Sequence, residues 1–63
     1  MDIGTEIKIA RTRKGLTQKQ LGEKIHLSAV TIGKIENNQT DPTIGNILRI
    51  AEALGVDVKS FFN

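Results

Sequence analysis

The chain has 63 residues, a length that accommodates one small domain spanning residues 1–63. It contains no cysteine and a single histidine, which excludes disulfides and a Cys/His zinc site. No apolar run is long enough to cross a membrane, and no basic and apolar leader precedes the first predicted helix, so we expect an intracellular domain without a metal or cofactor.

Charge is divided unevenly along the chain. Residues 1–34 hold seven Lys and Arg against three Asp and Glu, a net charge of +4, whereas residues 35–63 hold two against four, a net charge of −2. A basic half joined to an acidic half favours an anionic partner on one face, although many solvated surfaces share this pattern.

The first predicted helix has Asp2 as its N-cap and an apolar stripe of Ile3, Ile7 and Ala10. Gly15 follows three basic residues and is suited to the left-handed conformation that ends a helix. We therefore expect this helix to run from near Asp2 to just before Gly15.

Three further helices begin with the same motif, a hydrophobic staple. In this motif the apolar residue just before the capping residue packs against another apolar residue four positions after the cap. The caps are Thr17, which also forms a T-x-x-Q capping box with Gln20, then Ser28 and Asp57. This pattern predicts helices that start near residues 17, 28 and 57. The last should bury Phe61 and leave Phe62 at the edge.

One more helix, the fourth in chain order, is predicted between those that start near residues 28 and 57. It follows a polar loop at 37–42, with Thr43 as its cap and Gly55 at its end. Its apolar positions at helical spacing are Ile44, Ile47, Leu48, Ala51 and Leu54. No segment alternates with the period of a strand. The sequence thus predicts an all-α chain of five short helices.

The second and third helices are joined only by His26 and Leu27, which predicts a sharp crossing. Gly22, midway along the second helix, would allow the backbones to approach, or it is a neutral surface glycine. On the third helix Ile32 and Ile35 should face inward. The opposite side is small, partly apolar and almost free of acid, which suits a groove lined with anions, although an ordinary exposed face is the alternative.

The order of these motifs resembles the phage repressor and Cro-type helix-turn-helix regulators, the xenobiotic-response-element family. The resemblance extends over nearly the whole chain and is carried by Gly15-Leu16-Thr17-Gln18, Leu21-Gly22, Ser28, Thr31-Ile32, Ile35-Glu36, Pro42 and Ile50-Ala51-Glu52-Ala53-Leu54-Gly55-Val56. It implies a compact five-helix, lambda-repressor-like domain with a helix-turn-helix at about 17–37. Its implied partner is double-stranded operator DNA of two-fold symmetry, bound as a homodimer at a cytoplasmic, nucleoid-associated location.

The resemblance also implies roles for individual residues. Those expected at base edges are Ala29, Val30, Gly33 and Lys34. Those expected at phosphates, each of which could equally be a cap or a solvated group, are Thr17, Gln18, Thr31, Asn37, Thr40 and Thr43. Arg11 and Glu36 correspond to a half-buried structural ion pair. The dimer contact is expected at Val58, Lys59 and Phe62, unless this end of the chain frays.

Two positions depart from the family pattern, because His26 and Asn38 stand where glycine is usual. Both side chains are tolerated at positive φ, so we expect the fold to survive and His26 to have a structural role.

The leading interpretation is a sequence-specific transcriptional regulator of the repressor type. The alternative is a protein-interaction module of the same fold, such as an antitoxin or an assembly domain. The sequence offers no nucleophile–base pair, no paired carboxylates, no metal-ligand set and no evident small-molecule site, so an enzyme is not expected.

Overall fold

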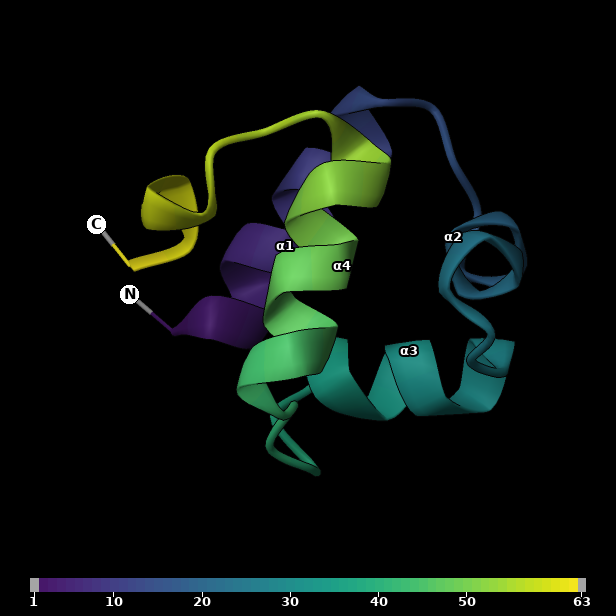
Figure 1. The fold of residues 1–63 in the computed structure, drawn as a ribbon. Coiled ribbons are helices and arrows are strands. Elements are labelled where there is room, and N and C mark those ends of the chain that lie inside the picture. The colour runs from purple at the N-terminus through teal and green to yellow at the C-terminus, as the bar shows by residue number, and fades with distance from the viewer. Residues whose placement is uncertain (1, 63) are drawn as a thin grey trace.

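The computed structural model describes residues 2–62, which form four α-helices and one short 3-10 helix (Figure 1). The α-helices are α1 (Ile3–Arg13), α2 (Gln18–Ile25), α3 (Ala29–Glu36) and α4 (Ile44–Leu54), and the 3-10 helix is η1 (Val58–Phe62). Residues 2–62 form helices joined by loops and contain no strand, as predicted. The fifth predicted helix, however, is a 3-10 helix, so the number of α-helices is four.

Hydrogen bonds around Asp57 explain why the last element is a 3-10 helix. The N–H of Ser60 donates to the carbonyl oxygen of Asp57, three residues back, at 2.9 Å. The N–H of Lys59 donates to the Asp57 carboxylate at 2.9 Å. Bonds between residues i and i+3 are typical of a 3-10 helix, a form that persists over only a few residues.

Each α-helix begins at the capping residue that the sequence predicts. The side chains of Asp2, Thr17, Ser28 and Thr43 accept a hydrogen bond from the backbone N–H three residues on, at 2.7 to 3.1 Å. Gln20 completes the capping box by accepting from the N–H of Thr17 at 2.8 Å. These bonds satisfy donors that would otherwise lack a partner in the first turn of each helix.

The ends of α2 and α3 lie close to left-handed residues that are not glycine. His26 has φ 62° and Asn38 has φ 59°, which confirms the positive φ expected at both positions. His26 is exposed, in line with its predicted structural role.

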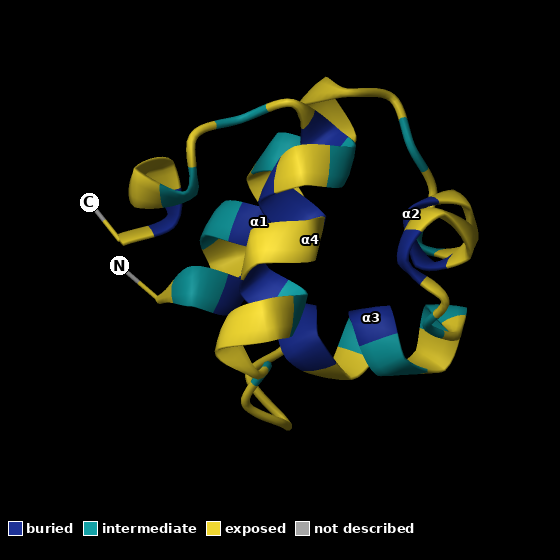
Figure 2. Ribbon diagram, in the orientation of Figure 1, coloured by how far each residue is buried: buried dark blue, intermediate teal, exposed yellow. Residues whose placement is uncertain are grey.

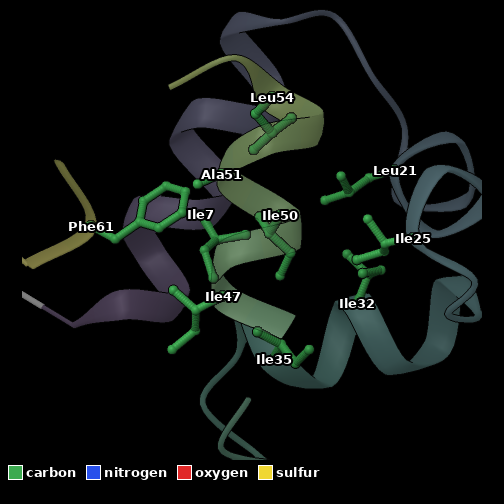
Figure 3. Packing of buried hydrophobic residues seen from close by; sticks show 10 residues of the cluster. All are labelled: Ile7, Leu21, Ile25, Ile32, Ile35, Ile47, Ile50, Ala51, Leu54 and Phe61. Carbon is green, nitrogen blue, oxygen red and sulfur yellow. The ribbon is translucent and has the colours of Figure 1, made fainter. Parts of the chain in front are cut away.

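The core is one cluster of ten hydrophobic side chains that every helix supplies (Figure 3). They are Ile7, Leu21, Ile25, Ile32, Ile35, Ile47, Ile50, Ala51, Leu54 and Phe61. Buried positions face the centre of the molecule and exposed positions face outward on each helix (Figure 2). As predicted, Ile32, Ile35 and Phe61 are inside, whereas Phe62 is 62% exposed.

The prediction for α4 was wrong at two positions. Ile44 and Leu48 were assigned to its apolar stripe, but they are 70% and 51% exposed. Ile50, which the stripe left out, is fully buried. Helix α4 packs against α1, α2 and η1, so its buried face is centred on Ile47, Ile50 and Leu54. Leu48 lies about 100° round the helix from Ile47, outside that face.

Helices α2 and α3 cross steeply, since Figure 1 shows α2 nearly end-on and α3 along its length. Gly22 permits this arrangement. A Cβ atom at this position would overlap the carbonyl oxygen of Leu27 in the connection between the two helices. The packing interpretation of Gly22 is therefore confirmed, and a neutral surface glycine is excluded.

Candidate nucleic-acid interface

The outward side of α3 carries the four residues expected at base edges. Val30 is 67% exposed and Lys34 is exposed, whereas Ala29 and Gly33 are half-buried. Val30 and Lys34 lie opposite the buried Ile32 and Ile35 at helical spacing, and Ala29 and Gly33 lie on the flank of the same face. The one acidic residue of α3, Glu36, is turned inward, so this side of the helix bears a lysine and no exposed carboxylate.

Glu36 and Arg11 form an ion pair between α3 and α1. Arg11 Nε donates to Glu36 Oε2 at 2.6 Å, and Arg11 Nη2 donates to Glu36 Oε1 at 3.1 Å. Arg11 Nη1 also donates to the carbonyl oxygen of Leu16 at 2.7 Å. Only 12% of the Arg11 side chain and 1% of the Glu36 side chain are exposed, so the pair is more deeply buried than the sequence led us to expect.

Gln18, the first residue of α2, also contacts this ion pair. Its amide Nε2 donates to Glu36 Oε1 at 3.2 Å. The side chain also lies over Gly33, because a Cβ built on Gly33 would be 3.4 Å from both Nε2 and Oε1 of Gln18. The structure therefore joins Arg11, Gln18 and Glu36 in one network under the outward side of α3.

Several of the residues expected at phosphates are helix caps. Thr17 and Thr43 accept backbone N–H groups as the N-caps of α2 and α4. The Thr31 hydroxyl lies 3.0 Å from the Ser28 hydroxyl in the cap of α3. A hydroxyl that accepts one bond keeps its own proton to donate, so capping and an outward contact are compatible. Asn37, the C-cap of α3, and Thr40 are exposed, and Gln18 belongs to the network described above.

The loop from α3 to α4 lies along the same edge of the molecule as the exposed side of α3, the lower edge in Figure 2. This loop contains Asn37 and Thr40 and ends at Thr43, so polar residues follow directly on the C-terminal end of α3.

The residues expected at a dimer contact lie at the other end of the molecule, on η1 (Figure 1). Phe62 and Lys59 are exposed, and Val58 is half-buried against the core. Helix α4 also exposes two apolar side chains, Ile44 and Leu48, that the sequence had led us to expect in the core. Their helical spacing is the same as that of core residues, so no local signal distinguishes them.

Two further observations concern metal ligands and membrane spans in residues 2–62. Within this part of the chain, no three His, Cys, Asp or Glu side chains are grouped so that they could hold a metal ion. None of the described helices is both long and apolar enough to cross a membrane.

Comparison with known proteins agrees with this geometry. A helix-turn-helix family matches residues 7–61. The immunity repressor protein of Bacillus phage phi105 is 37% identical over 60 residues, which cover 95% of this chain and 42% of the phage protein. The chain thus spans less than half the length of that relative.

Two solved structures share the whole arrangement of helices. The restriction-modification controller protein C.AhdI from Aeromonas hydrophila is 32% identical, with a TM-score of 0.90 over 95% of this chain and 91% of its own. The P22 c2 repressor, solved in complex with a synthetic operator, is 26% identical, with a TM-score of 0.88 over 97% of this chain and 92% of its own. The chain belongs to the helix-turn-helix family, as a domain of the phage repressor and Cro type.

Proposed function

We propose that the chain is the sequence-specific DNA-binding domain of a transcriptional regulator of the repressor type, with α3 as the helix that enters the major groove. The observation that carries this proposal is the outward side of α3. It presents the exposed Val30 and Lys34, and its one carboxylate is buried in an ion pair. A narrow apolar and basic helix face fits a groove lined by phosphates and base edges.

The side chains of α3 suggest what each would read. Ala29 and Val30 offer only apolar contacts, which match thymine methyl groups, and Gly33 keeps the helix surface low between them and Lys34. Lys34 can donate to guanine O6 and N7 or to a phosphate. Phosphate contacts would come from the start of α2, where the backbone N–H groups of the first turn and Gln18 lie, and from Thr17, Thr31, Asn37, Thr40 and Thr43.

We further propose that two copies bind adjacent half-sites of a two-fold-symmetric operator and contact each other through Val58, Lys59 and Phe62. The exposure of Phe62 supports this contact, and the exposed Ile44 and Leu48 of α4 add apolar surface outside the face of α3. A protein-interaction module of this fold would use the same apolar side chains to bind its partner. Protein interaction is therefore the second candidate function.

The first experiment is selection of duplexes from a random DNA pool, followed by titration of the selected duplex at several salt concentrations. Replacing Lys34 with Ala should weaken binding by ~1–3 kcal/mol if it reads a guanine. If it touches a phosphate, the slope of log affinity against log salt should fall by ~0.9. Lys24→Ala is the matched control, because Lys24 is an exposed lysine of α2 that lines a hollow with Arg49 and Glu52 of α4, a hollow that no residue of α3 lines.

The outcomes separate the two candidate functions. Enrichment of a defined sequence and loss of affinity in Lys34→Ala, but not in Lys24→Ala, would support the DNA-binding domain. Binding that is unchanged in Lys34→Ala at every salt concentration would contradict the position of α3 in the groove. Failure to enrich any sequence, with no salt-dependent binding to mixed DNA, would favour the interaction module.

A further inference from the structure

The Glu36 carboxylate receives one more hydrogen bond than its ion pair with Arg11 requires. Arg11 already donates to both carboxylate oxygens, at 2.6 and 3.1 Å. The amide of Gln18 adds a third bond at 3.2 Å. We infer that Glu36, besides pairing with Arg11, is a positioning residue that holds the Gln18 amide ready for contact with DNA. This inference rests on the proposed function.

The chemistry of the acceptor determines how Gln18 is oriented. An ionised carboxylate accepts hydrogen bonds and donates none, so only the NH₂ end of the Gln18 amide can face Glu36. One N–H of that group is used on Glu36 Oε1. The second N–H and the carbonyl oxygen of Gln18 remain for a ligand. Without Glu36, either end of the amide could turn inward.

The same amide lies close to Gly33 of α3. A Cβ at Gly33 would lie 3.4 Å from both terminal atoms of the Gln18 side chain, which is ordinary van der Waals contact. The amide therefore lies over the space that a side chain at Gly33 would enter, one residue before Lys34. Gln18 thus brings to the outward side of α3 an amide group, which Ala29, Val30, Gly33 and Lys34 do not provide.

Anchoring of this kind favours binding because of side-chain entropy. A free glutamine side chain at the start of a helix samples many rotamers and loses them when it contacts a ligand. A side chain already ordered in the free protein loses less freedom, so more of the contact energy appears as affinity. Stability alone gives a weaker reason for the third bond, since Arg11 already satisfies both oxygens of Glu36.

The test is a double-mutant cycle in DNA affinity with Gln18→Ala, Glu36→Gln and the double variant, against the duplex selected with the wild-type protein. Glu36→Gln leaves one oxygen, which the guanidinium of Arg11 takes, and turns an NH₂ group toward Gln18. The Gln18 amide must then rotate. Each measurement is made well below the melting temperature of that variant, as checked by circular dichroism.

We expect Gln18→Ala to weaken binding by a factor of about 3 to 10, the value of one net hydrogen bond. Glu36→Gln should also weaken it, although removal of a negative charge would by itself strengthen binding to DNA. The double variant should bind no more weakly than Gln18→Ala alone. A purely structural role for Glu36 predicts the same loss with and without Gln18, and that additive result would overturn the inference.

A measurement on the wild-type protein covers the case in which Glu36→Gln does not fold. In nuclear magnetic resonance spectra, the side-chain NH₂ of Gln18 should show cross-peaks to the backbone of Gly33 in the free protein, and its resonances should shift when the selected duplex is added. Averaged NH₂ signals without such cross-peaks, or signals that DNA leaves unchanged, would contradict the inference. If the wild-type protein selects no duplex, it is the proposed function that fails.

Discussion

Replacing Arg11 with Ala should be among the most damaging single changes in this chain. It would leave the Glu36 carboxylate, whose side chain is 1% exposed, with the Gln18 amide as its remaining side-chain donor. It would also remove the bond from Arg11 to the carbonyl oxygen of Leu16. A buried charge left without its partner costs about 3–5 kcal/mol of stability.

That loss is large relative to the whole fold. Native domains are stable by roughly 0.05–0.15 kcal/mol per residue, so a chain of 63 residues has about 3–9 kcal/mol. Glu36→Ala should cost less than Arg11→Ala, because the guanidinium that it leaves is 12% exposed and has a long stem. The double variant should be more stable than Arg11→Ala, since neither charge is then buried alone.

The assay is urea unfolding followed by circular dichroism for the four proteins of the cycle. The coupling between the two positions should lie between about 0.5 and 3 kcal/mol. Arg13→Ala is the matched control, because Arg13 is an exposed arginine on the same helix and should change stability by no more than ~0.5 kcal/mol. Single effects that add to within ~0.3–0.5 kcal/mol, or a double variant less stable than Arg11→Ala, would refute the reasoning.

Three further predictions test other parts of the fold. Gly22→Ala should destabilise the protein by ~1–3 kcal/mol in thermal melting, because the new Cβ meets a backbone carbonyl. Gly45→Ala, whose Cβ would have no neighbour nearer than 3.9 Å, should instead stabilise it by ~0.5–1 kcal/mol, and the reverse order of the two variants would contradict the packing. The backbone N–H of Thr5, followed by the Asn38 side chain, lowers the pKa of Asp2 from 3.8 to about 2. Because the pKa of Asp2 is lower in the folded state than in the unfolded state, the Asp2 carboxylate stabilises the fold. This contribution to stability is complete above the unfolded pKa and is lost as pH falls from about 4 to about 2. Asp2→Asn should therefore lose less stability than wild type over that range in acid unfolding curves, and equal losses would count against the cap. Phe62→Ser should leave the melting temperature nearly unchanged and abolish cooperative occupation of two half-sites in footprinting; persistent cooperativity would remove Phe62 from the dimer contact.

The sequence by itself determined the features that depend on residues close together in the chain. The caps at Asp2, Thr17, Ser28 and Thr43 could be predicted because each bond joins residues three positions apart. The left-handed conformation of His26 could be predicted because the family resemblance places this residue where glycine is usual, and histidine tolerates positive φ. The motifs in this order were also enough to identify the helix-turn-helix family.

Only the tertiary structure decided which way each helix turns its apolar residues and which distant side chains meet. Local spacing gave α4 several possible apolar faces, and packing against α1, α2 and η1 buried Ile50 while it left Ile44 and Leu48 exposed. The bond between Gln18 and Glu36 joins residues 18 positions apart, and no local pattern contains it. The physical reason is that capping and turn geometry act within one turn of backbone, whereas burial and long-range hydrogen bonds depend on how all the helices pack together.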